Sequence, residues 1–192
     1  MDIILFTGFS ASGKSTIASE VNKLLQLQYI SERKILHNIA SSRGFERTRH
    51  WLANESLEVI LEAARAETVQ RMREQRNSRG TVIDGSYDCE LPLCLRRIFP
   101  EAILTTIFIS LGPWEREQRM IRRLGGSAEI AGEEQSLIDG FKLRAGVGDV
   151  IKGADIVIDN SGTLEDSVRN LRQELERRRI GGFNPESGLL RA

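Results

Sequence analysis

Residues 8–15 read GFSASGKS, the full Gly-x-x-x-x-Gly-Lys-Ser pattern of a phosphate-binding loop. An apolar run at residues 3–6 precedes the loop, and a helix-like run at residues 15–25 follows it. The two glycines allow successive backbone N–H groups to point inward, and the following helix directs the positive end of its dipole at the same place. Strand, loop and helix agree, which favours a nucleotide site over a chance glycine-serine turn.

Lys14 and Ser15 carry the side chains of this loop that are suited to chemistry. We expect the Lys14 ammonium to reach the β- and γ-phosphates of a nucleotide and the Ser15 hydroxyl to hold Mg²⁺. The expected cofactors are therefore ATP and Mg²⁺, with GTP as the alternative nucleotide. The loop residues expected to contact the nucleotide are Gly8, Ser10, Ala11, Ser12, Gly13, Lys14, Ser15 and Thr16.

The composition limits what else the chain contains. Its 192 residues are 40% hydrophobic, which suits one good core and is short for two domains. We expect one domain over residues 1–180 and a loose tail at 181–192. Lys plus Arg and Asp plus Glu both total 27, so neither nucleic acid nor an anionic membrane is an expected partner. The expected partner is a small-molecule phosphate acceptor, and the chain is expected to be a monomer or homodimer.

Neither the apolar runs nor the cysteines suggest a secreted or membrane protein. No apolar stretch approaches the ~20 residues of a membrane span, and the N-terminus reads as a core strand rather than a signal peptide. These features predict a cytoplasmic protein. Cys89 and Cys94 have no histidine nearby in sequence and fit neither a zinc site nor a disulfide framework. We expect both to be buried thiols.

Short apolar runs and helical patterns alternate along the chain, which predicts an α/β fold. Such runs suit a parallel sheet that is buried on both faces. We expect a P-loop NTPase fold: a parallel five-stranded sheet with helices on both faces and a small lid. The predicted strands cover residues 3–7, 28–31, 81–84, 103–109 and 156–158. The predicted helices cover residues 15–25, 32–41, about 51–76, 91–98, 114–123, about 135–151 and 163–178.

A second chemical feature is TVIDGS at residues 81–86, an apolar strand that ends in Asp84. A carboxylate at the carboxyl end of a strand next to the first strand lies beside the phosphate loop. Asp84 is therefore expected to hold Mg²⁺ and to act in catalysis. The alternative is an Asp-Gly turn that only closes the strand. Asp88 is expected to bind substrate in the same pocket, or else to cap the helix that begins at Leu91.

A third feature is the arginine-rich helix within GPWEREQRMIRRLGG. Phosphoryl transfer needs positive charge over the moving group, so we expect a lid over about residues 113–150, with Arg119 and Arg123 acting in catalysis. The alternative pairs Arg119 with Glu115 on the helix surface and leaves the others in solvent. The spacing places four guanidinium groups on one broad face, those of Arg116, Arg119, Arg122 and Arg123.

Further arginines flank the long helix predicted at about residues 51–76. Several of those before it, around Gly44, could bind an anionic group of the acceptor, and we assign Arg33, Arg43 and Arg49 to substrate binding. The segment over about residues 31–77 is expected to cover the acceptor. The arginines near the end of the long predicted helix are expected to be solvated cations that complement the helix dipole. They are Arg71, Arg73, Arg76 and Arg79.

The last feature is ADIVIDNSGTLED at residues 154–166, a strand followed by a polar loop. A loop at the carboxyl edge of the sheet can pass beside a purine held over the phosphate loop, so Ser161 and Gly162 are expected to contact the nucleotide. Thr163 is expected to cap the final helix, with Asp166 in its first turn.

These motifs together resemble P-loop small-molecule kinases of the nucleoside monophosphate kinase type over about residues 1–178. VIDGSYD followed by FPEA is similar to cytidylate kinases, ADIVIDNSGTLED resembles the end of dephospho-CoA kinases, and FTGFSASGKSTIA is close to the phosphate loop of adenylylsulfate kinases. The chain departs from two of these patterns. Ser86 stands where cytidylate kinases have an arginine, and YISERK stands where adenylylsulfate kinases have Asp-Gly-Asp.

The resemblance implies a phosphotransferase that moves the γ-phosphoryl group of Mg-ATP to a small molecule, with a nucleoside monophosphate as the first choice of acceptor. Dephospho-CoA or another small alcohol is the alternative acceptor. An alternative of another class is a regulatory ATPase or switch, which needs a residue that orients water, and Gln118 and Gln135 are candidates. A third hypothesis is a degenerate kinase that only binds nucleotide, against which the intact Lys14 and Ser15 argue.

Overall fold

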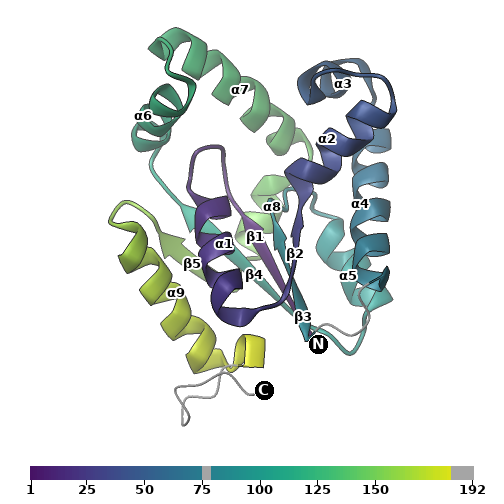
Figure 1. The fold of residues 1–192 in the computed structure, drawn as a ribbon, viewed down its shortest axis with the longest axis vertical. Helices are drawn as coiled ribbons and strands as arrows, with labels where there is room; N and C mark the ends of the chain where they lie inside the picture. The colour runs from purple at the N-terminus through teal and green to yellow at the C-terminus, as the bar shows by residue number, and fades with distance from the viewer. Residues whose placement is uncertain (75–78, 183–192) are drawn as a thin grey trace.

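Strands and helices alternate through the protein (Figure 1), and the computed structural model describes residues 1–74 and 79–182. The strands are β1 (Asp2–Thr7), β2 (Gln28–Ser31), β3 (Gly80–Asp84), β4 (Ile103–Ser110) and β5 (Ile156–Asp159). The helices are α1 (Lys14–Leu25), α2 (Glu32–Ser42), α3 (Thr48–Asn54), α4 (Leu57–Glu74), α5 (Leu91–Ile98), α6 (Pro113–Leu124), α7 (Ala128–Arg144), α8 (Val147–Lys152), α9 (Leu164–Arg178) and the short η1 (Ile180–Gly182).

The strands form one parallel sheet in the order β2-β3-β1-β4-β5. The first strand, β1, lies in the middle, with its Phe6 level with Asp84 of β3 and with Ile107 of β4. Because the strands are parallel, their carboxyl ends meet at one edge of the sheet (Figure 1). This order places the loop after β1 directly beside the end of β3, where a ligand site is expected.

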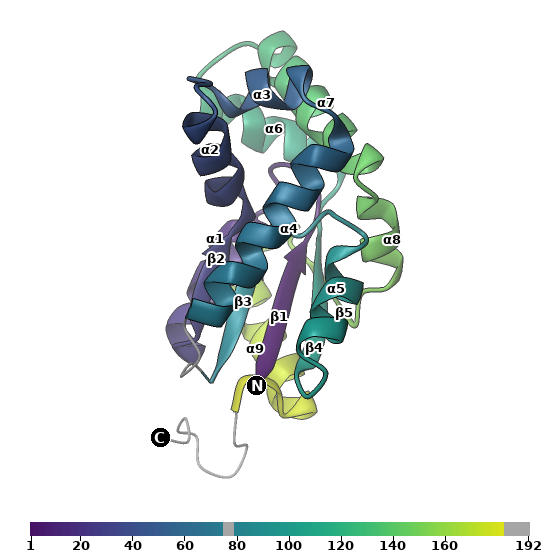
Figure 2. The same ribbon diagram turned by 90° about the vertical axis from the view of Figure 1, so that its right-hand side faces the viewer.

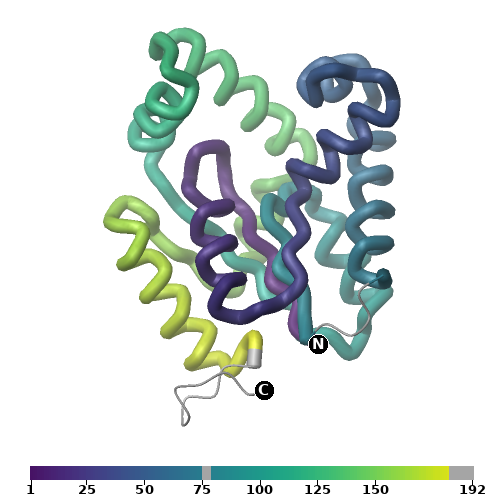
Figure 3. Tube along the Cα trace, in the orientation of Figure 1, coloured from purple at the N-terminus to yellow at the C-terminus, as the bar shows by residue number. Residues whose placement is uncertain are grey.

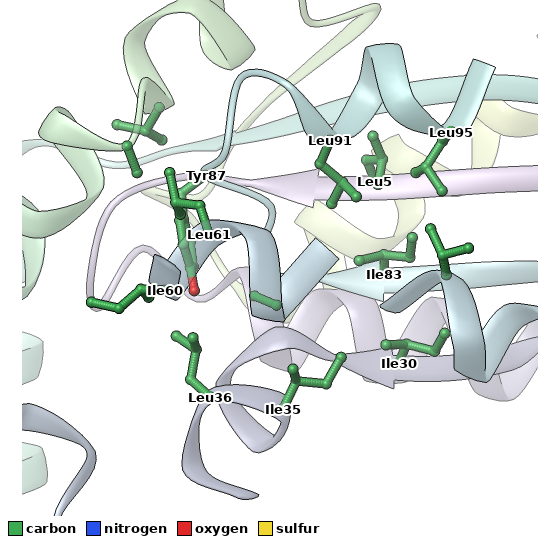
Figure 4. Packing of buried hydrophobic residues seen from close by; sticks show 14 of the residues in the cluster. Leu5, Ile30, Ile35, Leu36, Ile60, Leu61, Ile83, Tyr87, Leu91 and Leu95 are labelled. Carbon is green, nitrogen blue, oxygen red and sulfur yellow. The ribbon is translucent and has the colours of Figure 1, made fainter. Parts of the chain in front are cut away.

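Helices cover both faces of the sheet, and each face has its own core. Alternate residues of β1 point to opposite faces, so Ile4 joins one cluster with Ile17 of α1, while Leu5 joins the other. Figure 4 shows Leu5 packed with Ile83 of β3 and Leu91 of α5 in that second cluster. The fold class predicted from the sequence is confirmed.

Two groups of helices extend beyond the carboxyl edge of the sheet. The helices α6 and α7 form one group, α2 and α3 form the other, and the chain between β1 and α1 rises between them (Figure 3). The view turned by 90° shows α2, α3, α6 and α7 together beyond the carboxyl end of β1 (Figure 2). The two groups touch, since Arg49 Nη1 of α3 lies 3.8 Å from Glu134 Oε2 of α7. The phosphate loop is thus flanked by helices on both sides.

The single helix predicted at about residues 51–76 is wrong, because the structure has α3 and α4 there. Glu55 between them is extended, with φ −110° and ψ 154°. Ser56 Oγ then accepts a hydrogen bond from Val59 N–H at 3.3 Å, which satisfies a free donor and starts a new helix. Among the arginines expected to be solvated, Arg73 is exposed and Arg71 pairs with Glu67 at 2.7 Å, while Arg76 lies outside the described residues.

The helix predicted at about residues 135–151 is also wrong in its bounds. The helix α7 begins earlier, where Ser127 Oγ accepts a hydrogen bond from Ile130 N–H at 3.4 Å. It is separated from α8 by Gly146, whose φ of 95° is left-handed. A methyl group at Gly146 would lie 2.6 Å from Cys89 Sγ, so glycine here permits both the bend and close packing.

The sequence also led to predictions about the burial of the two cysteines and about membrane-spanning segments. Cys89 and Cys94 are free thiols, but both are only partly buried, so the expected full burial is wrong. Partial burial, together with the nearby Asp88 charge, raises the pKa of Cys89. In residues 1–74 and 79–182, no helix is long and apolar enough to cross a membrane.

Candidate functional site

The phosphate loop joins β1 to α1 and bends at two glycines. Gly8 (φ 147°) and Gly13 (φ 89°) both have positive φ, where a residue with a Cβ is strained. A methyl group on Gly13 would lie 2.2 Å from Asn160 Nδ2 and 3.0 Å from Arg119 Nη1. Glycine at this position therefore allows two distant segments to approach the loop backbone.

Ser15, Asp84 and Tyr29 form a hydrogen-bonded group beside the loop. Ser15 Oγ donates to Asp84 Oδ1 at 3.0 Å, and Tyr29 OH donates to Asp84 Oδ2 at 3.0 Å. Asp84 is only 4% exposed. Burial, together with the Asp84 carboxylate, raises the pKa of Tyr29, which keeps its hydroxyl protonated and donating. The structure therefore brings together the two residues assigned to Mg²⁺ from the sequence.

The Ser15 and Asp84 oxygens suit a Mg²⁺ ion that arrives with a nucleotide. A hydroxyl and a carboxylate oxygen 3.0 Å apart are the hard oxygen ligands that Mg²⁺ takes. Within the described part of the chain, no three acidic, histidine or cysteine side chains gather closely enough to hold a metal by themselves. Mg²⁺ usually keeps water and phosphate oxygens as its other ligands, so two protein oxygens are sufficient.

Helices α6 and α7 hold the other side of the loop. Asp139 of α7 accepts a hydrogen bond from Ser10 N–H at 2.8 Å and pairs with Arg116 of α6 at 2.5 Å. Lys142 Nζ, one turn further along α7, donates to the Gly8 carbonyl at 3.3 Å and to Ser10 Oγ at 3.2 Å. One anion and one cation from the same helix are thus bound to the phosphate loop.

The charges in this contact depend on burial and on each other. Burial alone would raise the pKa of Asp139, but hydrogen bonds from Ser10 and Arg116 outweigh it and the net pKa is lowered. Burial lowers the pKa of Lys142 well below its ordinary value, and the nearby Lys14 ammonium lowers it further. Burial also lowers the pKa of Lys14. An anion placed beside both lysines would stabilise their charged forms.

Arg119 of α6 lies against the loop. Its Nη2 donates to the Asn160 carbonyl at 2.8 Å, while its Nη1 is next to Gly13. Arg116 also reaches the loop, where its guanidinium lies over the Phe9 ring at 5.0 Å from the ring centre. The expected orientation of the arginine helix toward the loop therefore holds for these two side chains.

The other two arginines of α6 make contacts within their own helix. Arg122 Nε donates to the Gln118 carbonyl at 3.3 Å, and Arg123 Nη2 lies 2.9 Å from Met120 Sδ. Both arginines are exposed. Arg116, which the sequence analysis did not assign to catalysis, therefore lies closer to the loop than Arg123, which it did.

Asn160 connects the loop after β5 to the phosphate loop. Its Nδ2 donates to the Ser12 carbonyl at 2.7 Å, its Oδ1 accepts from Ser167 Oγ at 2.9 Å, and it is 4% exposed. The two residues assigned to the nucleotide from the sequence, Ser161 and Gly162, are exposed. Thr163 caps α9 as predicted, since its Oγ1 accepts from Asp166 N–H at 3.1 Å.

Replacing Asn160 with alanine is expected to lower the free energy of unfolding by about 1–3 kcal/mol, because the Ser12 carbonyl and the Ser167 hydroxyl lose a buried partner. Denaturant unfolding measures this change. The control is Ser161→Ala, whose hydroxyl donates to Asp159 Oδ2, two residues earlier on the surface. Equal losses in the two variants would contradict a structural role for Asn160.

The three arginines assigned to substrate lie in different surroundings. Arg43 pairs with Glu55 at 2.9 Å and its guanidinium lies 5.3 Å from the centre of the Trp51 ring. Arg49 is the residue that reaches Glu134 of α7. Arg33 is exposed in the first turn of α2. Besides burial, the charge of Arg33 contributes to the lowered pKa of Lys14, so Arg33 faces the loop closely enough to interact with it.

Asp88, the fourth residue assigned to substrate, is buried and paired. Arg65 Nη1 lies 3.2 Å from Asp88 Oδ2, and the Glu90 N–H donates to Asp88 Oδ1 at 3.0 Å. Burial raises the pKa of Asp88, although these two contacts oppose the effect. Asp88 lies three residues before α5, whose N-cap residue is Glu90 without a side-chain cap bond, so the alternative capping role of Asp88 is wrong.

Five residues that bond to the loop or lie beside it were not assigned a role from the sequence: Tyr29, Glu32, Asp139, Lys142 and Asn160. Glu32 follows β2 directly, and an acidic residue at the end of a parallel strand is a signal that could have been used. Asn160 lies in the polar stretch that was noted. Asp139 and Lys142 sit three residues apart in an ordinary helical pattern, so no sequence signal separates them from surface charges.

A phosphate loop after the central strand of a five-stranded parallel sheet, with basic helices against it, defines a P-loop NTPase fold. Residues 7–136 match the AAA_17 family, described as an AAA domain, and the chain belongs to that family. The chain is similar to a UPF0200 protein of Thermococcus onnurineus, with 27% identity over 180 residues that cover 91% of this chain and 97% of that protein. A UPF0200 protein of Thermococcus kodakarensis is 28% identical over 181 residues, covering 90% and 97%.

Solved structures of P-loop kinases share the fold. A gluconokinase from Sinorhizobium meliloti superimposes with a TM-score of 0.62 at 20% identity, over 92% of each chain. A shikimate kinase from Acinetobacter baumannii, in complex with shikimate, gives a TM-score of 0.55 at 15% identity, over 93% of this chain and 94% of that one. At these identities the likeness establishes the architecture.

Proposed function

We propose that the protein is a kinase that moves the γ-phosphoryl group of Mg-ATP to a small-molecule acceptor. The observation that carries this proposal is the set of cations gathered in or against the phosphate loop, which are Lys14, Lys142, Arg116 and Arg119. Cations from three separate segments suit the several negative charges of a triphosphate. The shared fold with a gluconokinase and a shikimate kinase supports a phosphotransferase of small molecules.

In this proposal the loop binds the phosphates of the nucleotide, and the helices stabilise the charge on the transferred group. The loop N–H groups and the N-terminus of α1 hold the phosphates, and Lys14 reaches the β- and γ-phosphates. Arg116 and Arg119 neutralise the charge that develops on the moving group. The segment of about residues 113–150, which contains α6 and α7, acts as a lid, and about residues 31–77 cover the acceptor. Catalysis then comes mainly from positioning and electrostatics.

Ser15 and Asp84 would hold Mg²⁺, whose charge offsets that of the phosphates when the nucleotide is bound. Tyr29 keeps the Asp84 carboxylate oriented by donating to its second oxygen. Ser161 and Gly162, exposed beside Asn160, stay assigned to the nucleotide base. Arg123 stays assigned to the lid, where it is exposed in this structure.

The acceptor decides between the kinase and its alternatives. A nucleoside monophosphate was the first choice from the sequence, and dephospho-CoA or another small alcohol was the second. A regulatory ATPase would use the same loop without an acceptor. Of the two glutamines considered for orienting water, Gln118 is partly buried on α6, and Gln135 on α7 has a buried Oε1 without a hydrogen bond within the described residues.

The test is ADP formation from Mg-ATP in the presence of single acceptors from both classes, with a control that contains none. We expect one acceptor to raise the rate by about tenfold or more, because water lacks the positioning that a bound acceptor has. Mass spectrometry of the product should show one added phosphoryl group. Nucleotide binding with ADP formation that no acceptor stimulates would instead support the regulatory ATPase.

A further inference from the structure

Buried polar atoms without hydrogen-bond partners in residues 1–74 and 79–182 gather around the phosphate loop, among them Thr7 Oγ1 and Ser12 Oγ of the loop segment. Three more belong to side chains that follow β2 and β3: Glu32 Oε2, Ser86 Oγ and Tyr87 OH. Their residues are 3%, 1% and 5% exposed. Buried polar atoms of proteins are nearly always hydrogen-bonded, and leaving one unbonded costs about 1–3 kcal/mol. Three such atoms at one edge of the sheet indicate that something outside the chain bonds to them.

These side chains come from the carboxyl ends of the two strands nearest the loop on that side. Glu32 follows β2 directly, and Ser86 and Tyr87 follow β3, with Ser31 level with Asp84 in the sheet. A methyl group on Gly85 would lie 3.8 Å from Glu32 Cβ and 3.9 Å from Lys14 Cε. Glu32 and the phosphate-loop lysine therefore face each other across Gly85, which adds no side chain between them.

Tyr87 closes this group on its apolar side. Its ring packs in the second core cluster beside Leu61, as Figure 4 shows, and edge-on against Phe141 of α7 with ring centres 5.5 Å apart. Burial raises the pKa of Tyr87, and the nearby Glu32 and Asp88 charges raise it further. The hydroxyl therefore stays protonated and can donate to a ligand or accept from it.

The charge around the three atoms selects the kind of ligand. Burial raises the pKa of Glu32 well above its ordinary value, and the charges of Asp88 and Asp84 add to this, while Lys14 and Lys142 oppose it. A nucleoside monophosphate reacts through a phosphate that carries negative charge, and a further anion here would disfavour the charged form of Glu32 still more. An alcohol brings no charge and offers a donor and an acceptor at each hydroxyl.

Most nearby arginines are not free to offset that effect. Arg43 is paired with Glu55, Arg49 with Glu134, and Arg65 with Asp88 and Glu90. Ser86 itself is neutral and buried at the position where cytidylate kinases have an arginine. Arg33, exposed on α2, is a guanidinium group left on this side for an acceptor phosphate, whereas the buried groups at the strand ends are hydroxyl and carboxyl groups.

We propose that Glu32, Ser86 and Tyr87 bind the reacting end of a small alcohol with more than one hydroxyl group, so that the phosphate acceptor is a polyol rather than a nucleoside monophosphate. This inference rests on the kinase function proposed above. The acceptor hydroxyl oxygen attacks the γ-phosphorus, and the bond from that phosphorus to the β,γ-bridging oxygen breaks to release ADP. The hydroxyl proton passes to the Glu32 carboxylate and then to water, so alcohol and ATP give a phosphate monoester, ADP and one proton.

The test compares two acceptor panels on the full chain with Mg-ATP. One panel holds polyols and sugar acids (glycerol, ribose, inositol, gluconate and shikimate), and the other holds CMP, UMP, AMP and GMP. We expect turnover with a member of the first panel. Glu32→Gln should then lower kcat by about 10²- to 10⁴-fold, the range for loss of a general base. Its affinity for Mg-ATP should stay within about threefold of the wild type, because Glu32 does not contact the phosphates in this proposal.

Glu165→Gln is the matched control, since Glu165 is exposed on α9, outside the segments assigned to the acceptor and the lid. If Glu32→Gln fails to fold, Ser86→Ala and Tyr87→Phe each remove one hydroxyl and should raise KM for the alcohol by about tenfold with Mg-ATP affinity unchanged. Turnover of a nucleoside monophosphate but no alcohol would overturn the inference and leave the kinase function intact, as would alcohol turnover that Glu32→Gln leaves unchanged. Absence of acceptor-stimulated turnover with both panels would count against the kinase function itself.

Discussion

Replacing Lys14 with methionine is expected to lower acceptor-dependent kcat/KM by about 10²- to 10³-fold, the usual effect of removing one charge-stabilising donor from an active site. Methionine keeps the length of the side chain but cannot bond to the β- and γ-phosphates. Burial lowers the pKa of Lys14 and the charge of Asp84 opposes this, so the ammonium lies within electrostatic reach of a Mg²⁺ ligand. Steady-state ADP formation with the best acceptor measures the effect.

The folded state should tolerate this change. Burial lowers the pKa of Lys14, which means that the folded protein disfavours its charge, so a neutral side chain should alter the free energy of unfolding by less than about 1 kcal/mol. The control is Lys23→Met on the same helix, where the side chain is 67% exposed and pairs only with Glu20. Full turnover by Lys14→Met would contradict the role given to Lys14 in the reaction, whereas equal losses in both variants would indicate damage to α1.

Replacing Trp51 with alanine is expected to lower the free energy of unfolding by about 3–5 kcal/mol, the range for truncating a large buried aromatic residue. Trp51 is fully buried, at 0% exposed, in the core cluster beneath α2 and α3. Its loss also removes the ring over which the Arg43 guanidinium lies. Thermal or denaturant unfolding measures the change, and the melting temperature should fall by about 6–20 °C for a chain of this length.

The chain provides its own comparison, because its second tryptophan, Trp114, is 67% exposed on α6. Trp114→Ala should change stability by no more than about 0.5 kcal/mol. Trp51→Phe should recover most of the loss, since it refills most of the space with an apolar ring. A loss below about 1 kcal/mol for Trp51→Ala would mean that the segment around α3 does not contribute to the cooperative core.

The sheet was predictable because its strands are short apolar runs with polar or glycine ends. The predicted strand at 28–31 is β2 itself, and β1 and β3 each extend the prediction by one residue at the start. The breaks between helices were harder to predict from the sequence. Apolar residues continue on one face through residues 51–76, so nothing in their spacing shows that Glu55 is extended and Ser56 starts a new helix. At this point the hydrogen bond to Ser56 Oγ fixes the start of the second helix, although the apolar periodicity continues through it.

The site was predictable where one segment carries it. Gly13, Lys14 and Ser15 are fixed by a motif, and Asp84 follows from the order of strands. The contacts of Asp139, Lys142 and Asn160 depend on which helix folds onto the loop, and this long-range packing leaves no local pattern. Which arginines of α6 contact the loop depends on the direction in which the helix faces. Arg116 and Arg119 contact it, whereas Arg122 and Arg123 do not.

The contact between α7 and the phosphate loop also affects how tightly a nucleotide binds. Asp139 and Lys142 belong to the same chain as the loop they bond to, so they are present at a high effective concentration that no dilution reduces. A phosphate that takes the place of the Asp139 carboxylate at the Ser10 N–H binds only the fraction of molecules in which this hydrogen bond is open. If that fraction is one in ten, the measured dissociation constant is about tenfold weaker than that of the open loop. A substitution on α7 can therefore change nucleotide affinity without touching the nucleotide.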